Sequence, residues 1–398
     1  MTPGPGLQRT TLPMGFSASG VNCGVRRYRP DLGILISDRD AVAVGTFTLN
    51  QCKAAPVLYC QSLLPSSRIR AIVTNSGQAN AATGALGIEN NSRMVASAAR
   101  ALDCKPEQVL TASTGVIGQQ MDIEKIETAM PELAHRAVET AESFALAILT
   151  TDLVPKSVTT TVTLSGGEVR ITGICKGSGM IHPNMATMLG YLLSDVQVST
   201  AQAQALLSDA VNESFNMISV DGDMSTNDCC FLMANGASGV SLKTESDLLK
   251  FKAALHEVAK VLAQSIAIDG EGATKLIEVR LKGSPDLALA RRAARGVTLS
   301  PLIKTAIHGE DPNWGRILAR LGAEQVPTSA LDRMTLVLQG TQLFEKGQPV
   351  TFDRDAVRAS MKVGKIVIEI DLKSGFHEAV AWGCDLTKKY VDINTEYS

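Results

Sequence analysis

A threonine at the junction between two kinds of sequence is the residue best placed to do chemistry. The segment KGSGMIHPNMATMLGYLLSD, residues 176–195, begins glycine-rich and turns apolar just after Thr187. A threonine hydroxyl is a weak nucleophile unless a base takes its proton. The α-amine of an N-terminal threonine can be that base, because its unperturbed pKa of about 8 lies near neutral pH. Such an amine forms only when the bond between Ala186 and Thr187 is cut.

The residues before this bond suit a self-cleaving loop. Gly177 and Gly179 allow backbone conformations that are closed to other residues, and Pro183 stiffens the approach. Strain in such a loop would let Oγ of Thr187 attack the carbonyl of Ala186, and hydrolysis of the resulting ester would free the amine. The simpler interpretation is a glycine-rich turn that enters a strand, and composition alone favours that simpler interpretation.

Composition and charge narrow the class of protein. A chain of 398 residues predicts one large or two medium-sized domains. The net charge of −2, the lack of a basic stripe and the 4% aromatic content argue against nucleic-acid binding. No run approaches the roughly 18 apolar residues of a membrane span, and none near the N-terminus is typical of a signal peptide. We therefore expect a cytoplasmic protein.

The cysteines and acidic residues predict neither disulfides nor a metal site. The eight cysteines form no C-x-x-C pair and have no histidine at zinc-ligand spacing, so reduced thiols are expected. Cys229 and Cys230 cannot both face one core from a strand, so one of them should lie at the surface or at a second interface. Asp221, Asp223 and Asp228 resemble a metal cluster, but such runs commonly cap turns, and we predict no metal.

Apolar periodicity predicts strands that alternate with helices along the whole chain. Strands are expected at 33–38, 41–48, 70–75, 157–164, 168–175, 228–235, 276–283, 334–340, 365–372 and 377–386. Helices are expected at 90–102, 130–149, 200–215, 246–267, 286–296 and 311–322, with Pro131 in the first turn of the second. No G-x-G-x-x-G motif opens a helix after a strand, so the pattern favours layered α/β packing over a dinucleotide fold.

A resemblance to a known family favours the self-cleaving loop over the simple glycine-rich turn. KGSGMIHPNMATML is similar to the self-cleavage segment of the ornithine acetyltransferases, also called glutamate N-acetyltransferases. Eight other segments agree with that family in the same order along nearly the whole chain. They are NQCKAAPV (50–57), NSGQANAATG (75–84), ASTGVIG (112–118), LTTDLVPK (149–156), DGDMSTND (221–228), DGEGATK (269–275), SPLIKTAIHGEDPNWGR (300–316) and GCDLTKKYVDINTEY (383–397).

The resemblance implies an N-terminal-nucleophile-type enzyme that is made as one precursor. Its fold would be an α/β fold, a layered α-β-β-α sandwich, with an additional smaller α/β domain in the C-terminal part. Cleavage would give an α chain, 1–186, and a β chain, 187–398, which the family assembles as two α and two β chains. The family transfers acetyl from N-acetylornithine to glutamate through acetyl-threonine, without a cofactor. Acetyl-CoA as an additional donor stays open.

Each expected role falls on a matching residue. Thr187 matches the nucleophile, while Thr114 and Gly115 match an oxyanion hole built from one hydroxyl and one backbone N–H. Lys176 matches a substrate-contacting lysine, whose cation could hold a carboxylate and ease proton loss from the Thr187 ammonium. Read alone, Thr114 and Gly115 would be a turn at a strand end and Lys176 a solvated loop residue.

Three further residues match substrate contacts. Thr150 matches a binding position, and Glu271 matches the residue expected to meet the amine end of ornithine, since a carboxylate suits an ammonium group. Asn394 matches a contact near the C-terminus. The family pattern places a Ser or Thr five positions after this asparagine, whereas this chain ends at Ser398, four positions after it.

Three alternatives remain open. A self-cleaving aminopeptidase or amidase would use the same acyl-threonine with water as acceptor, and the charged set Thr150, Lys176, Glu271 and Asn394 argues against it. A non-enzymatic paralogue or binding module would stay uncut after purification. An acetyltransferase of secondary metabolism would share all of the motifs.

Overall fold

The computed structural model describes residues 10–181 and 188–396. In it, one long strand takes part in both β-layers of the fold. Strand β2 (Leu32–Phe47) pairs with β1 (Phe16–Val21) through residues 32–37 and with β9 (Cys229–Ala234) through residues 42–47. The exposed residues 38–40 and a register shift against β3 (Ser66–Gln78) separate the two parts. The two strands predicted at 33–38 and 41–48 are therefore a single bent strand.

The bent strand joins two groups of strands into one continuous ladder. Its order is β4-β3-β2-β9-β7-β6-β5, with β1 also paired to β2. The remaining bounds are β4 (Val109–Val116), β5 (Lys156–Leu164), β6 (Gly167–Lys176) and β7 (Leu189–Ser194). The strands predicted at 157–164 and 168–175 are β5 and β6, which pair antiparallel from end to end as a hairpin.

The two groups of strands pack face to face. Leu35 and Ile72 from one group share a buried core with Tyr191 and Phe231 from the other. The Tyr191 hydroxyl and Oγ1 of Thr74 lie 2.7 Å apart and join the layers by a buried hydrogen bond. Helix α4 (Glu142–Ala147) adds apolar side chains to this core at one edge of the sandwich. The inner core is thus a β-sandwich closed by its own bent strand.

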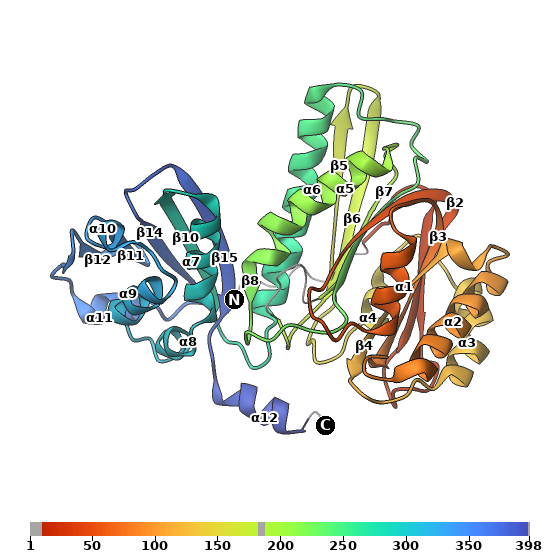
Figure 1. The fold of residues 1–398 in the computed structure, drawn as a ribbon, viewed down its shortest axis with the longest axis horizontal. Helices are drawn as coiled ribbons and strands as arrows, with labels where there is room; N and C mark the ends of the chain where they lie inside the picture. Colours follow the sequence, from red (N-terminus) through yellow and green to blue (C-terminus); the bar gives the residue numbers. More distant parts are fainter. Residues whose placement is uncertain (1–9, 182–187, 397–398) are drawn as a thin grey trace.

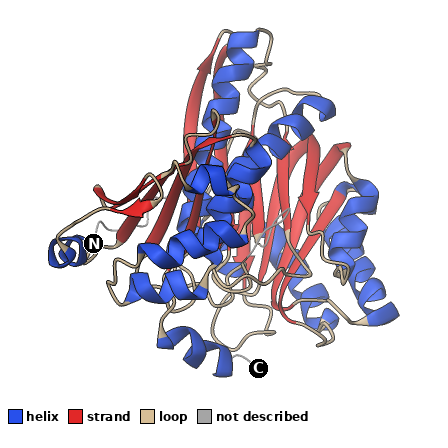
Figure 2. Ribbon diagram, turned by 60° about the vertical axis from the view of Figure 1, so that its left-hand side comes forward, coloured by secondary structure: helices blue, strands red, loops and turns tan. Residues whose placement is uncertain are grey.

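Helices cover both outer faces of the sandwich (Figures 1 and 2). Helices α2 (Gly84–Ala101) and α3 (Ile123–His135) pack against β1–β4, and α1 (Ala55–Leu63) lies beside β4. Helices α5 (Thr200–Glu213) and α6 (Glu245–Ile268) cover the side formed by β5, β6, β7 and β9. The predicted α-β-β-α layering is confirmed.

A smaller α/β domain follows in the C-terminal part, as predicted (blue in Figure 1). Its sheet has the order β13-β12-β11-β14-β10-β15-β8. The strands are β8 (Ile218–Ser219), β10 (Leu276–Ser284), β11 (Thr335–Leu338), β12 (Thr341–Glu345), β13 (Gln348–Pro349), β14 (Lys365–Asp371) and β15 (His377–Cys384). The helices are α7 (Leu287–Leu299), α8 (Pro301–His308), α9 (Trp314–Ala323), α10 (Thr328–Leu331), α11 (Arg354–Ser360) and α12 (Lys388–Glu396). Short 3₁₀ turns occupy η1 (Pro106–Gln108) and η2 (Phe215–Met217).

The prediction of a single helix at 130–149 is wrong, because two helices, α3 and α4, occupy this part of the chain. Helix α3 begins at Ile123, so Pro131 lies inside it, and the chain then leaves the helix before α4. Between the two helices, Thr140 and Val138 form β-bridges to Thr11 and Ala18. Tertiary pairing with the edge of β1 therefore overrides a helical sequence pattern.

The other predicted helices and strands are present with shifted ends. Helix α2 begins at Gly84, six residues before the start predicted at residue 90, and Asn90 is buried within the helix. Cys229 and Cys230 face opposite sides of β9, one toward the inner core and one toward the α5–α6 layer. We expected one cysteine of this pair to lie at the surface or at a second interface. The structure shows the second of these, because Cys230 packs between β9 and the α5–α6 layer. No helix within the described ranges combines the length and apolar character needed to cross a membrane.

Candidate active site

A cavity of about 130 Å³ lies where several strands of the sandwich end. It is bounded by the C-terminal ends of β4 and β6, the start of β7 and the segment before β9. The described residues around it are Ala79, Thr114, Gly115, Ile117, Thr150, Thr151, Lys176, Gly179, Met180, Ile181, Met188, Leu189, Ser225, Thr226, Asn227, Asp228, Glu271 and Asn394. Every predicted site residue that the structure describes is among them. Ala186, Thr187 and Ser398 lie outside the described residues.

Thr114 and Lys176 meet across the two layers of the sandwich. Thr114 is the third residue from the end of β4, Lys176 is the last residue of β6, and both are buried. Nζ of Lys176 donates a hydrogen bond to Oγ1 of Thr114 over 3.3 Å. A hydroxyl that accepts from an ammonium keeps its own hydrogen for another acceptor, so Thr114 can donate into the cavity.

Gly115 has a backbone conformation that requires glycine. Its φ is +132°, and a Cβ on this residue would lie 2.2 Å from the carbonyl carbon of Gly77 in β3. No side chain fits so close to a neighbouring backbone. The parallel register of β3 and β4 shifts at Gly77 and Gln78. The pairing of β3 and β4 is therefore irregular at Gly115, beside the Thr114 hydroxyl.

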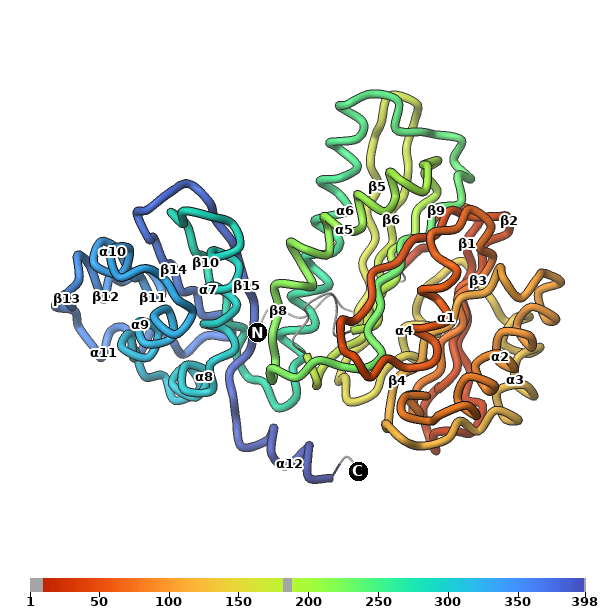
Figure 3. Tube along the Cα trace, viewed as in Figure 1, coloured from red at the N-terminus to blue at the C-terminus, as the bar shows by residue number. Residues whose placement is uncertain are grey.

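Glu271 forms the opposite wall of the cavity together with the C-terminal helix. Its Oε2 accepts a hydrogen bond of 2.7 Å from Nδ2 of Asn394 in α12. A Cβ on Gly179 would lie 2.2 Å from the Glu271 carboxylate, so glycine at this position leaves room for the acid. Figure 3 shows α12 leaving the C-terminal domain and running below it, near the lower ends of the sandwich strands. The C-terminal domain thus contributes to the cavity through α12.

A buried ion cluster holds three segments of the cavity wall together. Nζ of Lys156 lies 2.7 Å from Oδ1 of Asp152 and 2.6 Å from Oδ2 of Asp269. Asp152 also accepts the backbone N–H groups of Thr150 and Gly177. All three charged side chains are 0–5% exposed. The cluster fixes the segments that carry Thr150, Lys176 and Glu271.

Burial and neighbouring charges shift the pKa values within this cluster. Burial raises the pKa of the Asp152 carboxyl, but the charges of Lys156 and Lys176 with several hydrogen bonds outweigh it and hold that pKa below its usual range. Burial lowers the pKa of Lys176 below that of an ordinary lysine, although Asp152, Asp228 and Glu271 oppose this effect. Lys176 therefore gives up a proton more readily than a surface lysine does.

The chain is fixed on both sides of the segment 182–187. The backbone N–H groups of Met180 and Ile181 donate to the Asp221 carboxylate over 2.6 and 2.8 Å. On the far side, Leu189 pairs with Lys176 in the antiparallel ladder of β6 and β7. The chain leaves the sheet at Lys176 and returns to it directly opposite.

Asp221 thus caps a turn, as the sequence suggested, through bonds to Met180, Ile181 and Asp223. Within residues 10–181 and 188–396, no three His, Cys, Asp or Glu side chains gather as they would to hold a metal ion.

Sequence reasoning missed the residues that support the cavity. Asp152, Lys156 and Asp269 all lie in the segments LTTDLVPK and DGEGATK, which pointed only to Thr150 and Glu271. Asn227 was also missed, although its Nδ2 bridges the carbonyl groups of Ala79 and Ser113 beside the cavity. One sequence signal for the ion cluster was available: Lys156 follows Asp152 by four residues, just where a β-rich segment begins.

The layered α-β-β-α sandwich defines an α/β fold of the N-terminal-nucleophile type. Residues 17–398 match the profile of the ArgJ family. The chain is 46% identical over 394 residues to the arginine biosynthesis bifunctional protein ArgJ of Thermotoga neapolitana, covering 97% of this chain and 99% of that protein. It is 44% identical to the chloroplastic protein of the same name from Sorghum bicolor, covering 98% and 86%.

A solved structure is similar as well. The arginine biosynthesis bifunctional protein of Bacillus halodurans aligns with a TM-score of 0.51 and 37% sequence identity, over 53% of this chain and 100% of that chain. This chain belongs to the ArgJ family.

Replacing Lys156 with methionine should destabilise the protein by about 3–5 kcal/mol, because it leaves two carboxylates buried without their cation. In the wild type, the depressed pKa of Asp152 contributes stability that is complete above the unfolded pKa of about 4 and is lost on acidification below it. Without Lys156 the buried carboxyls should have raised pKa values. The variant should then lose stability as pH rises above about 4.

Urea denaturation at pH 5 and pH 8 measures both effects. Lys252→Met is the matched control, because its ion pair with Asp209 lies at the surface, with side chains 42% and 39% exposed. That variant should lose at most about 1 kcal/mol at either pH. Equal losses for the two variants, or a Lys156→Met protein that is more stable at pH 8 than at pH 5, would contradict the role given to Lys156.

Proposed function

We propose that this chain is a self-cleaving glutamate N-acetyltransferase that moves acetyl from N²-acetylornithine to L-glutamate. The products are ornithine and N-acetylglutamate, and the acetyl group is carried on Thr187 between two half-reactions. The observation that carries the proposal is the gathering of Thr114, Gly115, Lys176 and Glu271 around one cavity. Met188, which follows Thr187 directly in the chain, also lines that cavity.

Strand order supports cleavage into 1–186 and 187–398. Strands β7 and β9 come from the second part and lie between β2 and β6, which come from the first. Two chains produced by a cut at Ala186–Thr187 would remain interleaved in one sheet. Residues 187–398 are 212 of 398, or 53% of the chain. The Bacillus halodurans chain aligns in full to the same share of this chain, which supports a half-length product.

In the first half-reaction, the free α-amine of Thr187 takes the proton of its own hydroxyl, and Oγ attacks the acetyl carbonyl of N-acetylornithine. The oxyanion that forms accepts hydrogen bonds from the Thr114 hydroxyl and the Gly115 N–H. The C–N bond then breaks, the ornithine nitrogen takes the proton from the Thr187 ammonium, and the acetyl group stays on Oγ as an ester. The lowered pKa of Lys176 beside Thr114 eases these proton transfers.

In the second half-reaction, the α-amine of glutamate attacks the acetyl ester. The C–O bond breaks, the acetyl group leaves on nitrogen, and the proton returns to Oγ of Thr187. Donor and acceptor share an α-amino-acid skeleton, so they can occupy the same contacts in turn. Lys176 and Asn394 suit the part that both share, while the Glu271 carboxylate suits the cationic side chain of ornithine.

The charges of the cavity favour an amino-acid acceptor over water. A buried lysine and a buried glutamate line the same small cavity, which suits a molecule with charges of both signs and argues against a general amidase. Relatives are named bifunctional, and acetyl-CoA would be an additional donor. An acetyltransferase of secondary metabolism would differ in its acceptor.

For assembly and compartment we propose two α and two β chains in the cytoplasm. All eight cysteines are free thiols, which suits a reducing compartment. Static light scattering measures the assembly directly.

Purified protein should consist of two chains, the second beginning at Thr187. Intact mass spectrometry and N-terminal sequencing measure this. Thr187→Ala should remain a single chain, because no hydroxyl is present to attack Ala186, while Thr200→Ala at the start of α5 should be cut normally. Wild-type protein that stays uncut, or a Thr187→Ala protein that is cut at the same bond, would refute the self-cleavage proposal.

Thr114→Ala should slow acetyl transfer by roughly 10²–10³-fold, because it removes one donor to the oxyanion. KM should change little, since the oxyanion exists only after attack. Thr114→Ser keeps the hydroxyl and should retain most of the activity, and Thr128→Ala, at an exposed position of helix α3, should transfer acetyl at the wild-type rate. A large rise in KM with normal turnover would instead assign Thr114 to substrate binding.

A further inference from the structure

One buried side chain beside the candidate active site joins the ends of two strands. Asn227 lies in the segment before β9, is 5% exposed and lines the cavity. Its Nδ2 donates hydrogen bonds to the carbonyl of Ala79, which follows β3, over 2.5 Å and to that of Ser113 in β4 over 2.8 Å. Ser113 directly precedes Thr114, so the second bond acts on the peptide unit that these two residues share.

The orientation of the Asn227 amide follows from its neighbours. Two carbonyl groups face one end of the amide, and only its NH₂ end can donate to them. The Thr226 hydroxyl donates to Oδ1 at the other end over 2.6 Å. Both amide hydrogens and the amide oxygen thus have partners within the protein, which favours a single position of this side chain.

The segment that carries Asn227 is itself held by the loop that follows β2. The backbone N–H of Ala54 donates to the carbonyl of Thr226 over 2.9 Å. The backbone N–H of Thr48 donates to the carbonyl of Asp228 over 3.0 Å. Because these bonds lie on both sides of Asn227 in the chain, its backbone is a fixed base from which the amide holds β4.

The strand end that Asn227 contacts has irregular pairing of its own. The register of β3 and β4 shifts at Gln78, which pairs with both Thr114 and Val116. A second amide acts on the same part of β4, since Oδ1 of Asn75 accepts a hydrogen bond of 2.6 Å from the Ser113 hydroxyl. Side-chain amides thus hold both the carbonyl and the hydroxyl of Ser113 where the ladder is irregular.

We propose that Asn227 is a positioning residue for acetyl transfer, which holds the Thr114 hydroxyl where the oxyanion forms. A donor stabilises an oxyanion only when it lies about 2.7–3.1 Å from the place that the charge will occupy. The Ser113 carbonyl and the Thr114 N–H share one planar peptide unit, so a bond to that carbonyl fixes the plane from which Thr114 projects. This role rests on the acetyl-transfer function proposed above, and it makes a residue of 187–398 control a donor of 1–186.

Asn227→Ala should lower kcat for acetyl transfer by roughly 10–100-fold, because a small displacement of a reacting or stabilising group is costly. KM should change little, since the oxyanion exists only after attack. In a Thr114→Ala background the same substitution should lower kcat by less than about 3-fold, because the donor that it positions is already absent. Steady-state kinetics measure these values, with rates referred to the amount of cleaved chain found by intact mass spectrometry.

Thr226→Val is a milder second variant. It removes the hydroxyl that donates to Oδ1 of Asn227 and keeps the shape of the side chain. It therefore tests the role of Asn227 even where Asn227→Ala does not fold or is not cut. It should lower kcat by about 3–10-fold with little change in KM, again only where Thr114 is intact.

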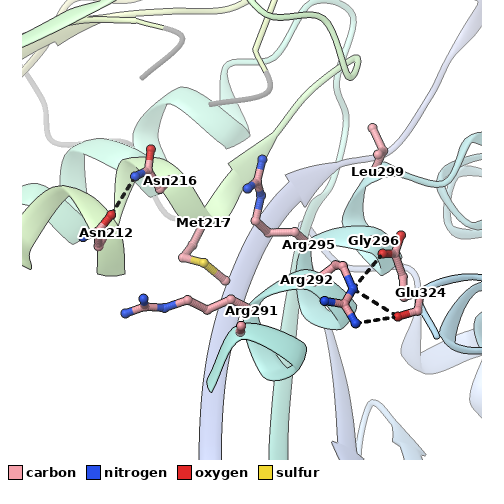
Figure 4. Close-up of a pocket in the computed structure, with 10 residues that line it drawn as sticks. Asn212, Asn216, Met217, Arg291, Arg292, Arg295, Gly296, Leu299 and Glu324 are labelled. Atoms are coloured by element: carbon pink, nitrogen blue, oxygen red, sulfur yellow. Dashed lines mark hydrogen bonds and ion pairs between the residues drawn. The ribbon is translucent and has the colours of Figure 1, made fainter. Parts of the chain in front are cut away.

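Two controls separate positioning from a general loss of stability. Gln339→Ala removes a similar amide, because Nε2 of Gln339 donates to the carbonyls of Ser360 and Lys365 in the C-terminal domain over 3.1 and 3.2 Å. Asn212→Ala alters a separate cavity of about 390 Å³ between α5 and α7, where Oδ1 of Asn212 accepts from Nδ2 of Asn216 (Figure 4). Both variants should transfer acetyl with the wild-type kcat.

The outcomes distinguish this role from the function on which it rests. Wild-type protein that transfers no acetyl from N-acetylornithine to glutamate would contradict the function itself, and the role with it. With an active wild type, two results would overturn the role of Asn227 alone. One is a wild-type kcat in Asn227→Ala, or in Thr226→Val where Asn227→Ala does not fold or is not cut. The other is an equal fold-loss of kcat with and without the Thr114 hydroxyl.

Discussion

The buried ion cluster of Asp152, Lys156 and Asp269 is the interaction on which the candidate active site depends. Each carboxylate accepts a hydrogen bond from Lys156 and from at least one backbone N–H group. A buried ion pair stabilises a fold only when its remaining hydrogen-bonding capacity is satisfied, and removing one partner is then very costly. The geometry of the cavity wall is therefore tied to the stability of the fold.

The cluster also spans the proposed cleavage site. Asp152 and Lys156 belong to residues 1–186, whereas Asp269 and the neighbouring Glu271 belong to residues 187–398. Strands β7 and β9 of the second part lie between strands of the first. A cut before Thr187 would free an amine without releasing any of the residues around the cavity. The candidate active site would therefore keep its geometry after the proposed cleavage.

Much of this organisation could be predicted from sequence. Alternating apolar residues located the strands, and the matched motifs located Thr114, Lys176 and Glu271, which the structure brings together from β4, β6 and the segment after α6. Short-range patterns failed where distant contacts decide the local structure. Residues 136–141 look helical, but bridges from Val138 to Ala18 and from Thr140 to Thr11 keep this stretch out of a helix. The contact of Lys156 with Asp269 was missed for the same reason, because 113 residues of sequence separate the two.

The central claim is that Thr187 carries the acetyl group, and intact mass spectrometry after the addition of N-acetylornithine alone tests it most directly. The account predicts that the 187–398 chain gains the mass of one acetyl group. Peptide fragmentation should assign that group to Thr187, one equivalent of ornithine should be released, and adding glutamate should remove the group as N-acetylglutamate. An unmodified 187–398 chain under the same conditions, in a preparation that transfers acetyl normally once glutamate is present, would contradict the account.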